Sequence, residues 1–283
     1  MQSQETTAMA TPIPLDTFNL GFIGAGKMAE SIAKGMVKSG ILPASRIRTA
    51  VHKDASRREA FSSLGVKVYD TNQEVVEESN VIVFSVKPQV VKDVVLQLKP
   101  ALSKKKLLVS VAAGTTLSDL QEWAGCSRFI RVMPNTPAAV GEAASVMSLG
   151  ETATKEDGEL VATMFGAIGK IWTANEKLFD AITGLSGSGP AYIFLAIDAM
   201  ADGGVAAGLP RDLARGLASQ TVLGAASMAI HTGKHPGQLK DDVASPGGTT
   251  IAGIHELEKG GFRGILMNAI VAAAKRGREL SQN

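Results

Sequence analysis

The chain has 283 residues, of which 45% are hydrophobic and 20% charged, and its formal net charge is +2. This length allows one large domain or two ordinary ones with a sizeable buried core. A charge so close to neutral argues against nucleic acid or an anionic membrane as the main partner. No apolar run approaches the roughly 20 residues that span a bilayer.

The first nineteen residues are polar and contain no Lys or Arg, but they include Glu5 and Asp16. A transit peptide is Arg-rich and acid-poor, and a signal peptide needs an apolar centre. We therefore expect residues 1–19 to be a disordered tail on a cytoplasmic protein. The single cysteine, Cys126, cannot form an intramolecular disulfide, and we expect it to be structural.

Residues 20–178 alternate short β-branched runs with helical patterns. Strands are predicted at Leu20–Ile23, Ile47–Val51, Val66–Tyr69, Val81–Val86, Leu107–Val111, Phe129–Val132 and Ser145–Leu149, with Ile168–Trp172 as a possible edge. Helices are predicted through Met28, Ile32 and Met36 up to Gly40, around Asp54–Leu64, and over Gln89–Leu98. The continuous apolar run 81–86 is typical of a strand buried on both faces of a parallel sheet. This alternation predicts a doubly wound α/β sheet.

Residues 179–283 show no convincing period-two segment and are rich in Ala, Leu and Gly. The patterns predict helices over Pro190–Ala206, Arg211–Ile230, Ile251–Glu258 and Arg263–Leu280. We therefore expect an all-α domain that begins after residue 178.

Charge is scarce in the first half of this helical domain. The 57 residues from Leu178 to Lys234 contain seven charged side chains: Asp180, Asp198, Asp202, Arg211, Asp212, Arg215 and Lys234. A few helices of a domain of about 100 residues do not enclose such apolar surfaces alone. Because the Gly and Pro spacing disfavours a membrane, we expect an obligate homo-oligomer built through this domain.

A glycine-rich turn follows the first predicted strand and opens the first helix. Gly24-Ala25-Gly26-Lys27-Met28-Ala29 matches G-x-G-x-x-A. The first glycine permits a tight turn, the second admits a pyrophosphate close to the backbone, and the helix N-terminus faces the phosphates. In this strand–turn–helix context the motif predicts a Rossmann-type domain that binds a nicotinamide dinucleotide.

The tip of the second strand favours NADPH, with NADH as the weaker alternative. An Asp or Glu at this position binds the ribose 2′-hydroxyl of NAD, but Val51-His52-Lys53 holds no carboxylate. Lys53, Arg57 and Arg58 cluster behind the tip, either for a 2′-phosphate or as a solvated helix face. Val86-Lys87-Pro88 and Ala112-Ala113-Gly114 end two further strands, where ligands of such sheets bind.

A second glycine-rich motif, Ser245-Pro246-Gly247-Gly248-Thr249-Thr250, precedes the helix predicted from Ile251. It supplies backbone N–H groups at a helix N-terminus beside hydroxyl groups, which is typical of a carboxylate or phosphate cradle. An ordinary N-cap with a glycine turn is the alternative. A similar turn, Gly187-Ser188-Gly189-Pro190, begins the first long helix and is expected to frame the same cleft.

Over nearly its whole length the sequence resembles the pyrroline-5-carboxylate reductases. The resemblance rests on Gly21–Met28, Val86–Pro88, Met133–Pro137, Leu185–Tyr192, Asp202–Val205, Ser245–Thr250 and Glu258–Arg263. It implies reduction of 1-pyrroline-5-carboxylate to L-proline, the last step of proline synthesis. It also implies a Rossmann domain followed by a helical domain that intertwines in a homodimer, with the dimers assembling into a ring, expected to be a decamer.

The resemblance also implies residue roles. The backbone of Gly248 and Thr249 would hold the substrate carboxylate, the Thr250 hydroxyl would hydrogen-bond the ring nitrogen as the catalytic residue, and Asn72 would contact the adenosine. The expected substrate site is Glu176, Asp242, Ser245, Gly247, Gly248, Thr249 and Thr250, where Glu176 and Asp242 are alternatively solvated loop charges. The expected cofactor site is Ile23, Gly24, Ala25, Gly26, Lys27, Met28, Val51, His52, Lys53, Asn72, Val86, Lys87, Pro88, Ala112, Ala113 and Gly114.

Two rival functions make different predictions. A β-hydroxyacid dehydrogenase needs a catalytic Lys on the helical domain, yet residues 179–231 contain none. A non-catalytic dinucleotide sensor would bind the cofactor without turnover, which the Ser245–Thr250 cradle disfavours. His231 and His235 have no third ligand after them, so we expect no metal site.

Overall fold

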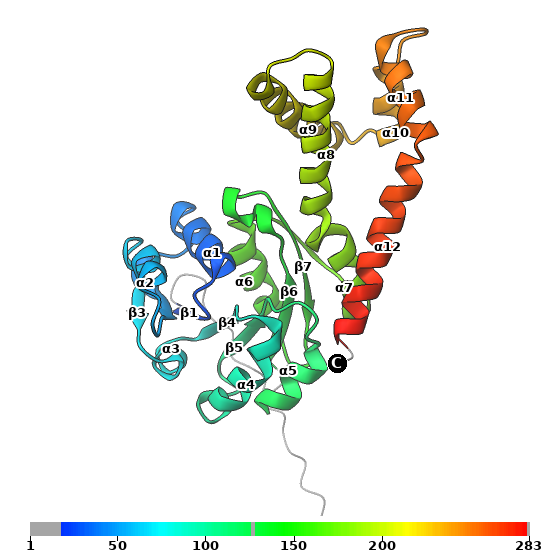
Figure 1. The fold of residues 1–283 in the computed structure, drawn as a ribbon. Coiled ribbons are helices and arrows are strands. Elements are labelled where there is room, and N and C mark those ends of the chain that lie inside the picture. The colour runs from blue at the N-terminus through cyan, green and yellow to red at the C-terminus, as the bar shows by residue number, and fades with distance from the viewer. Residues whose placement is uncertain (1–17, 126–127, 282–283) are drawn as a thin grey trace, which may run out of the picture. The chain divides into compact units, whose positions relative to one another are not determined.

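The computed structural model describes residues 18–125 and 128–281, and these divide into two compact units (Figure 1). Unit 1 contains the described residues up to Gly187 and those from Ala273 onward, and unit 2 contains Ser188–Ala272. The disordered tail expected over residues 1–19 is too long at its C-terminal end. Phe18 is buried, and the Asn19 N–H donates to Asn80 Oδ1. Residues 1–17 and Cys126 lie outside the described residues.

Unit 1 extends beyond the boundary expected at residue 178. Phe179 is buried there, with the guanidinium carbon of Arg131 4.6 Å from its ring centroid. Asn135 Nδ2 donates a hydrogen bond of 3.0 Å to the Ser186 carbonyl. These contacts hold the segment after residue 178 on the sheet domain, and so the units divide after Gly187.

The sheet of unit 1 has eight strands in the order β3-β2-β1-β4-β5-β6-β7-β8. Their bounds are β1 Leu20–Ile23, β2 Ile47–Ala50, β3 Lys67–Tyr69, β4 Val81–Phe84, β5 Leu107–Ser110, β6 Phe129–Met133, β7 Ala143–Leu149 and β8 Gly169–Thr173. All neighbouring pairs are parallel except β6 with β7. The β6–β7 connection holds only the short helix η3 (Thr136–Val140), too short for the crossover that a parallel pair requires. The possible edge strand is confirmed as β8.

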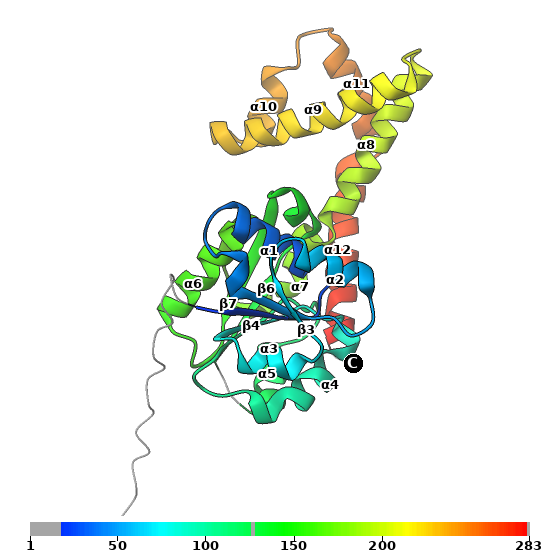
Figure 2. The ribbon, with the colours of Figure 1, turned by 90° about the vertical axis from the view of Figure 1, so that its left-hand side faces the viewer.

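Helices cover both faces of this sheet (Figures 1 and 2). The bounds are α1 Lys27–Lys38, α2 Ala55–Ser62, α3 Asn72–Glu77, α4 Pro88–Leu98, α5 Leu117–Ala124, α6 Lys155–Gly166 and α7 Phe179–Ile182, with the shorter turns η1 Ala44–Arg46, η2 Lys99–Ala101, η4 Glu176–Leu178 and the π-helix η5 Thr183–Gly187. Side chains of α1, α2 and α6 share one core with the sheet, and those of α3, α4 and α5 share another. The doubly wound fold is therefore confirmed.

Unit 2 is entirely helical and has a small core. Its helices are α8 Gly189–Ala206, α9 Arg211–Thr232, α10 Pro236–Asp242, α11 Thr249–Lys259 and the first turns of α12 Phe262–Ser281. Ala201 of α8 packs with Ala214 and Ala218 of α9, and Gly204 allows the helices to approach, since a Cβ there would lie 3.1 Å from the Ala214 Cβ. Among the described residues no helix is both long and apolar enough to cross a bilayer.

Candidate functional site

The chain reverses its direction of sheet growth between β1 and β4. From β1 it continues to β2 on one side, and from β3 it crosses back to β4 on the other side of β1. Parallel sheets of this kind bind ligands outside the carboxyl ends of the strands at such a switch point. The glycine-rich turn after β1 and residues 85–87 after β4 meet at this place.

The glycine-rich turn fits closely against β4. Gly24 has φ of 103°, and a Cβ there would lie 2.9 Å from the backbone carbon and oxygen of Ser85. The Ser85 hydroxyl donates to the Gly24 carbonyl at 2.7 Å. Gly26 is the N-cap of α1 and has no side-chain cap. A Cβ on Gly26 would meet only the Ser85 oxygen, at 3.9 Å, so its absence leaves the α1 N-terminus open to a ligand.

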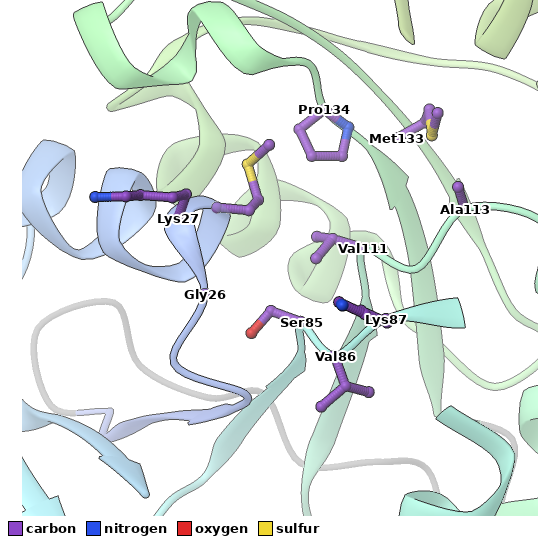
Figure 3. A pocket seen from close by; sticks show the side chains of 10 residues that line it. Gly26, Lys27, Ser85, Val86, Lys87, Val111, Ala113, Met133 and Pro134 are labelled. Carbon is purple, nitrogen blue, oxygen red and sulfur yellow. The ribbon is translucent and has the colours of Figure 1, made fainter. Parts of the chain in front are cut away.

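A cleft of about 320 Å³ opens at this point (Figure 3). It is lined by Gly26, Lys27, Met28, Ser85, Val86, Lys87, Val111, Ala113, Met133 and Pro134. In Figure 3 the Lys27 side chain points away from the other labelled side chains, and its Nζ lies 3.3 Å from Glu30 Oε2. An uncapped helix N-terminus beside an apolar wall suits a dinucleotide, whose phosphates need N–H donors and whose flat rings need apolar contact.

The cleft brings together six residues of the expected cofactor site: Gly26, Lys27, Met28, Val86, Lys87 and Ala113. Sequence reasoning did not assign Ser85, Val111, Met133 and Pro134 to it. Each of these residues ends or follows a strand at the same sheet edge, and that position was the available signal. The remaining expected residues do not line this cleft: Ile23, Gly24, Ala25, Val51, His52, Lys53, Asn72, Pro88, Ala112 and Gly114.

The three cations behind β2 do not form one group. Arg57 donates to the carbonyl oxygens of Ala25 and Gly26 and to Glu30. Arg58 donates to the Val51 carbonyl and to Asp70. Lys53 is exposed, and no other described residue pairs with it. The two arginines therefore have different partners, and binding of a 2′-phosphate by these three cations stays a prediction.

The second glycine-rich motif has the expected local form. Gly247 has φ of 66°, and Gly248 is the N-cap of α11 without a side-chain cap. Thr249 and Thr250 form the first turn of α11 and are exposed. The Gly248 N–H donates to the Ser245 carbonyl at 3.1 Å within the turn. The open start of a helix with hydroxyl groups beside it is a place that can bind an anion.

The two acidic residues of the expected substrate site belong to different units. In unit 1, Glu176 Oε1 accepts from the Leu117 N–H at 2.7 Å and from Arg131 Nη1 at 2.8 Å. In unit 2, Asp242 accepts from Lys234 at 2.9 Å, and this ion pair lowers the pKa of its carboxyl group. Glu176 is thus not a free loop charge, since it joins β6 to the start of α5.

The two histidines of the possible metal motif make local contacts. His231 Nδ1 lies 2.8 Å from the Ser227 carbonyl oxygen, and His235 Nδ1 accepts from the Gly237 N–H at the start of α10. Among the described residues, no three His, Cys, Asp or Glu side chains gather as metal ligands.

Comparison with known proteins adds independent findings. Residues 176–280 match the family model described as pyrroline-5-carboxylate reductase dimerisation, and residues 19–114 match the one described as NADP oxidoreductase, coenzyme F420-dependent. The pyrroline-5-carboxylate reductase of Glycine max is 75% identical over 95% of this chain and 98% of its own. The structure of the Coxiella burnetii pyrroline-5-carboxylate reductase matches with 37% identity and a TM-score of 0.88, over 95% of this chain and all of the other. The Plasmodium falciparum pyrroline carboxylate reductase with NADP bound matches with 32% identity and a TM-score of 0.85, over the same shares.

Proposed function

The chain belongs to the pyrroline-5-carboxylate reductases, and from that premise we propose that it reduces 1-pyrroline-5-carboxylate to L-proline with NADPH, using NADH more weakly. The observation that carries the proposal is the cleft at the switch point, where the open N-terminus of α1 meets an apolar wall. A protonated cyclic imine already carries an electrophilic charge, so the protein needs to orient it more than to supply a strong acid.

The proposed cofactor site lies in unit 1. The N–H groups at the start of α1 bind the pyrophosphate, and Asn72 at the start of α3 contacts the adenosine. Preference for NADPH rests on the strand tip at His52 and Lys53, which holds a cation and no carboxylate. The reduced nicotinamide, when bound, supplies a hydride to the imine carbon while the C=N electron pair moves onto the protonated nitrogen.

The proposed substrate site uses the cradle of unit 2. The backbone at Gly248 and Thr249 holds the carboxylate, with Ser245 and Gly247 shaping the turn, and the Thr250 hydroxyl accepts a hydrogen bond from the ring nitrogen. Asp242, kept ionised by Lys234, adds negative charge for the cationic imine. Glu176, which already pairs with Arg131 in unit 1, stays a proposed member of the substrate site.

The proposed assembly is a homodimer formed through unit 2, with dimers joined into a decameric ring. The matched dimerisation family and the many exposed apolar side chains of this unit support a homo-oligomer. The mass of the purified protein in solution tests both the dimer and the ring. The expected cytoplasmic location also stays a proposal, which imaging of the tagged full chain tests.

The reaction is tested by NADPH oxidation with 1-pyrroline-5-carboxylate, with NADH in parallel and proline measured as product. Rapid oxidation with one proline formed per cofactor consumed supports the proposal, and a higher kcat/KM with NADPH supports the cofactor preference. NADPH binding without turnover would contradict it and favour a dinucleotide sensor.

A further inference from the structure

The guanidinium group of Arg57 lies against the glycine-rich turn. From α2, its Nε donates to the Ala25 carbonyl at 2.7 Å and its Nη2 to the Gly26 carbonyl at 3.0 Å. Its Nη1 donates to Glu30 Oε2 in α1 at 2.7 Å. All three nitrogens of the planar fork are therefore engaged with the turn or with the helix that follows it.

These contacts determine which way the turn presents its N–H groups. In a trans peptide the carbonyl of one residue and the N–H of the next point in opposite directions. Arg57 holds the Ala25 carbonyl, and it shares the Gly26 carbonyl with the Glu30 N–H, which donates to it at 3.0 Å. The N–H groups of Gly26 and Lys27 are therefore directed away from Arg57. Gly26 and Lys27 line the cleft, and N–H groups at this point of α1 bind anions.

Arg57 is itself held in place from two further directions. Glu30 carries its counter-charge and also accepts from Lys34 at 2.6 Å, and the cations around it lower the pKa of its carboxyl group to about 2. The guanidinium carbon lies 5.5 Å from the centroid of the Phe61 ring. A side chain fixed in this way costs little conformational entropy when the cofactor binds.

We propose that Arg57 is a positioning residue that orients the glycine-rich turn for the pyrophosphate shared by NADPH and NADH, and that it does not select the 2′-phosphate. The inference rests on the proposed cofactor site. It differs from the usual role of a cation behind the second strand, because contact with a 2′-phosphate favours NADPH alone.

The test measures direct binding of NADPH and of NADH, by cofactor fluorescence, to the full-length protein and its variants. Arg57→Met keeps the apolar stem and loses every hydrogen bond of the guanidinium. We expect it to raise the Kd of both cofactors by a similar factor, about 10- to 100-fold, the range for lost hydrogen bonds to a charged group. Arg57→Lys, which retains the charge without the fork, should raise both by a smaller, equal factor.

Two controls separate the turn from the 2′-phosphate. Arg58→Met removes the same type of cation one position further along α2, where it contacts Val51 and Asp70, and should leave the Kd of NADH unchanged. Lys53→Met should raise the Kd of NADPH and leave the Kd of NADH unchanged. Thermal unfolding of the cofactor-free variants shows whether they fold. If Arg57→Met does not fold, the cofactor affinities of Arg57→Lys test the positioning role.

The outcomes distinguish this inference from the proposed function. The positioning role is overturned if the Arg57 variants lose affinity for NADPH alone, or if they keep the affinity of the unmodified protein for both cofactors. Failure of the unmodified protein to bind either cofactor would instead overturn the proposed cofactor site itself.

Discussion

The Ser85 hydroxyl group donates a hydrogen bond of 2.7 Å to the carbonyl oxygen of Gly24 and so fastens the end of β4 to the turn that follows β1. The two strands are neighbours at the switch point, but their residues are 61 positions apart in the chain. The turn is therefore supported by Ser85 on one side and by Arg57 on another.

Replacing Ser85 with Ala should loosen this turn. We expect the Kd of NADPH to rise about threefold to tenfold, because the change removes one neutral hydrogen bond worth about 1 kcal/mol. The measurement is a fluorescence titration. Ser145→Ala is the matched control, since Ser145 is a buried serine of β7 whose hydroxyl group has no partner among the described residues. Equal effects of the two changes would show that Ser85 matters only for packing.

The ion pairs of Glu30 should make stability depend on pH. Its pKa falls from 4.5 to about 2, chiefly through Lys34 and then Arg57, so its contribution is present above pH 4.5 and is lost as the pH falls towards 2. A pKa shift of this size corresponds to a contribution of about 3 kcal/mol to the free energy of unfolding. Because Lys34 and Lys27 are largely exposed, we expect about half of that.

The measurement compares the unfolding midpoints of the unmodified protein and Glu30→Gln at pH 7 and near pH 2. The difference between the two proteins should be largest at pH 7 and should shrink in acid. A difference independent of pH would contradict the assignment to the charge of Glu30.

Hydrophobic periodicity and the glycine-rich turn predicted the strands and the doubly wound sheet, but capping boxes would have added further helices. Three of the helices of unit 1 that were not expected, α3, α5 and α6, each begin with a capping box: Thr71 with Glu74, Thr116 with Asp119, and Thr154 with Asp157. These pairs are three residues apart and are readable in the sequence. The helices were missed because they are short or only weakly amphipathic.

Contacts between residues far apart in the chain could not be predicted, because no local sequence pattern encodes them. Glu176 binds the Leu117 N–H 59 positions away, and Arg57 reaches Gly26 across 31. Proximity in the sequence grouped Arg57 with Lys53 and Arg58, but the two arginines of α2 contact different groups: Arg57 the glycine-rich turn, and Arg58 the Val51 carbonyl and Asp70. The turn motif was predictable from its own residues, while its supports depend on how distant elements pack.

The buried ion pair between Arg128 and Asp157 should be important for the stability of unit 1. Two hydrogen bonds, of 2.9 and 2.7 Å, join the side chains, and both side chains are almost fully buried. Arg128→Met leaves a buried carboxylate without its cation, which should cost about 3–5 kcal/mol. Chemical denaturation measures this.

Two further variants test the cause. Adding Asp157→Asn to Arg128→Met should recover part of the loss, because the stranded charge is removed. Lys155→Met, which breaks the exposed pair with Glu159 in the same helix, should change stability by less than about 1 kcal/mol. Similar losses in all three variants would point to general disturbance of α6.

The exposed apolar face of unit 2 should be where subunits meet. Leu195 in α8 is 72% exposed, and Phe194 beside it is 63% exposed. Introducing charge with Phe194→Glu and Leu195→Glu together should lower the mass measured by light scattering to that of a single chain. Val140→Glu, at a residue of unit 1 that is 78% exposed, is the control and should leave the mass unchanged. Dissociation by the control alone would place the interface on unit 1.

Thr250 should serve the reaction and not the fold. It lies in the first turn of α11, is exposed, and follows the N-cap glycine by two positions. Thr250→Val keeps the shape and removes the hydroxyl group, so we expect kcat to fall about 10- to 100-fold, since a hydrogen bond to a charged group is worth about 1.5–3 kcal/mol. The Kd of NADPH should stay within about twofold, because the residues of the proposed cofactor site all belong to unit 1.

Thr249→Val is the matched control for this change. The proposed role of Thr249 is carried by its backbone N–H, which valine retains, so its kcat should fall far less than that of Thr250→Val. Steady-state kinetics gives kcat and KM for 1-pyrroline-5-carboxylate, and fluorescence titration gives the cofactor Kd. Thr250→Ser restores the hydroxyl group and should recover most of the turnover. Equal loss of turnover and cofactor affinity in Thr250→Val, without rescue by serine, would mean that the cradle serves the structure of unit 2.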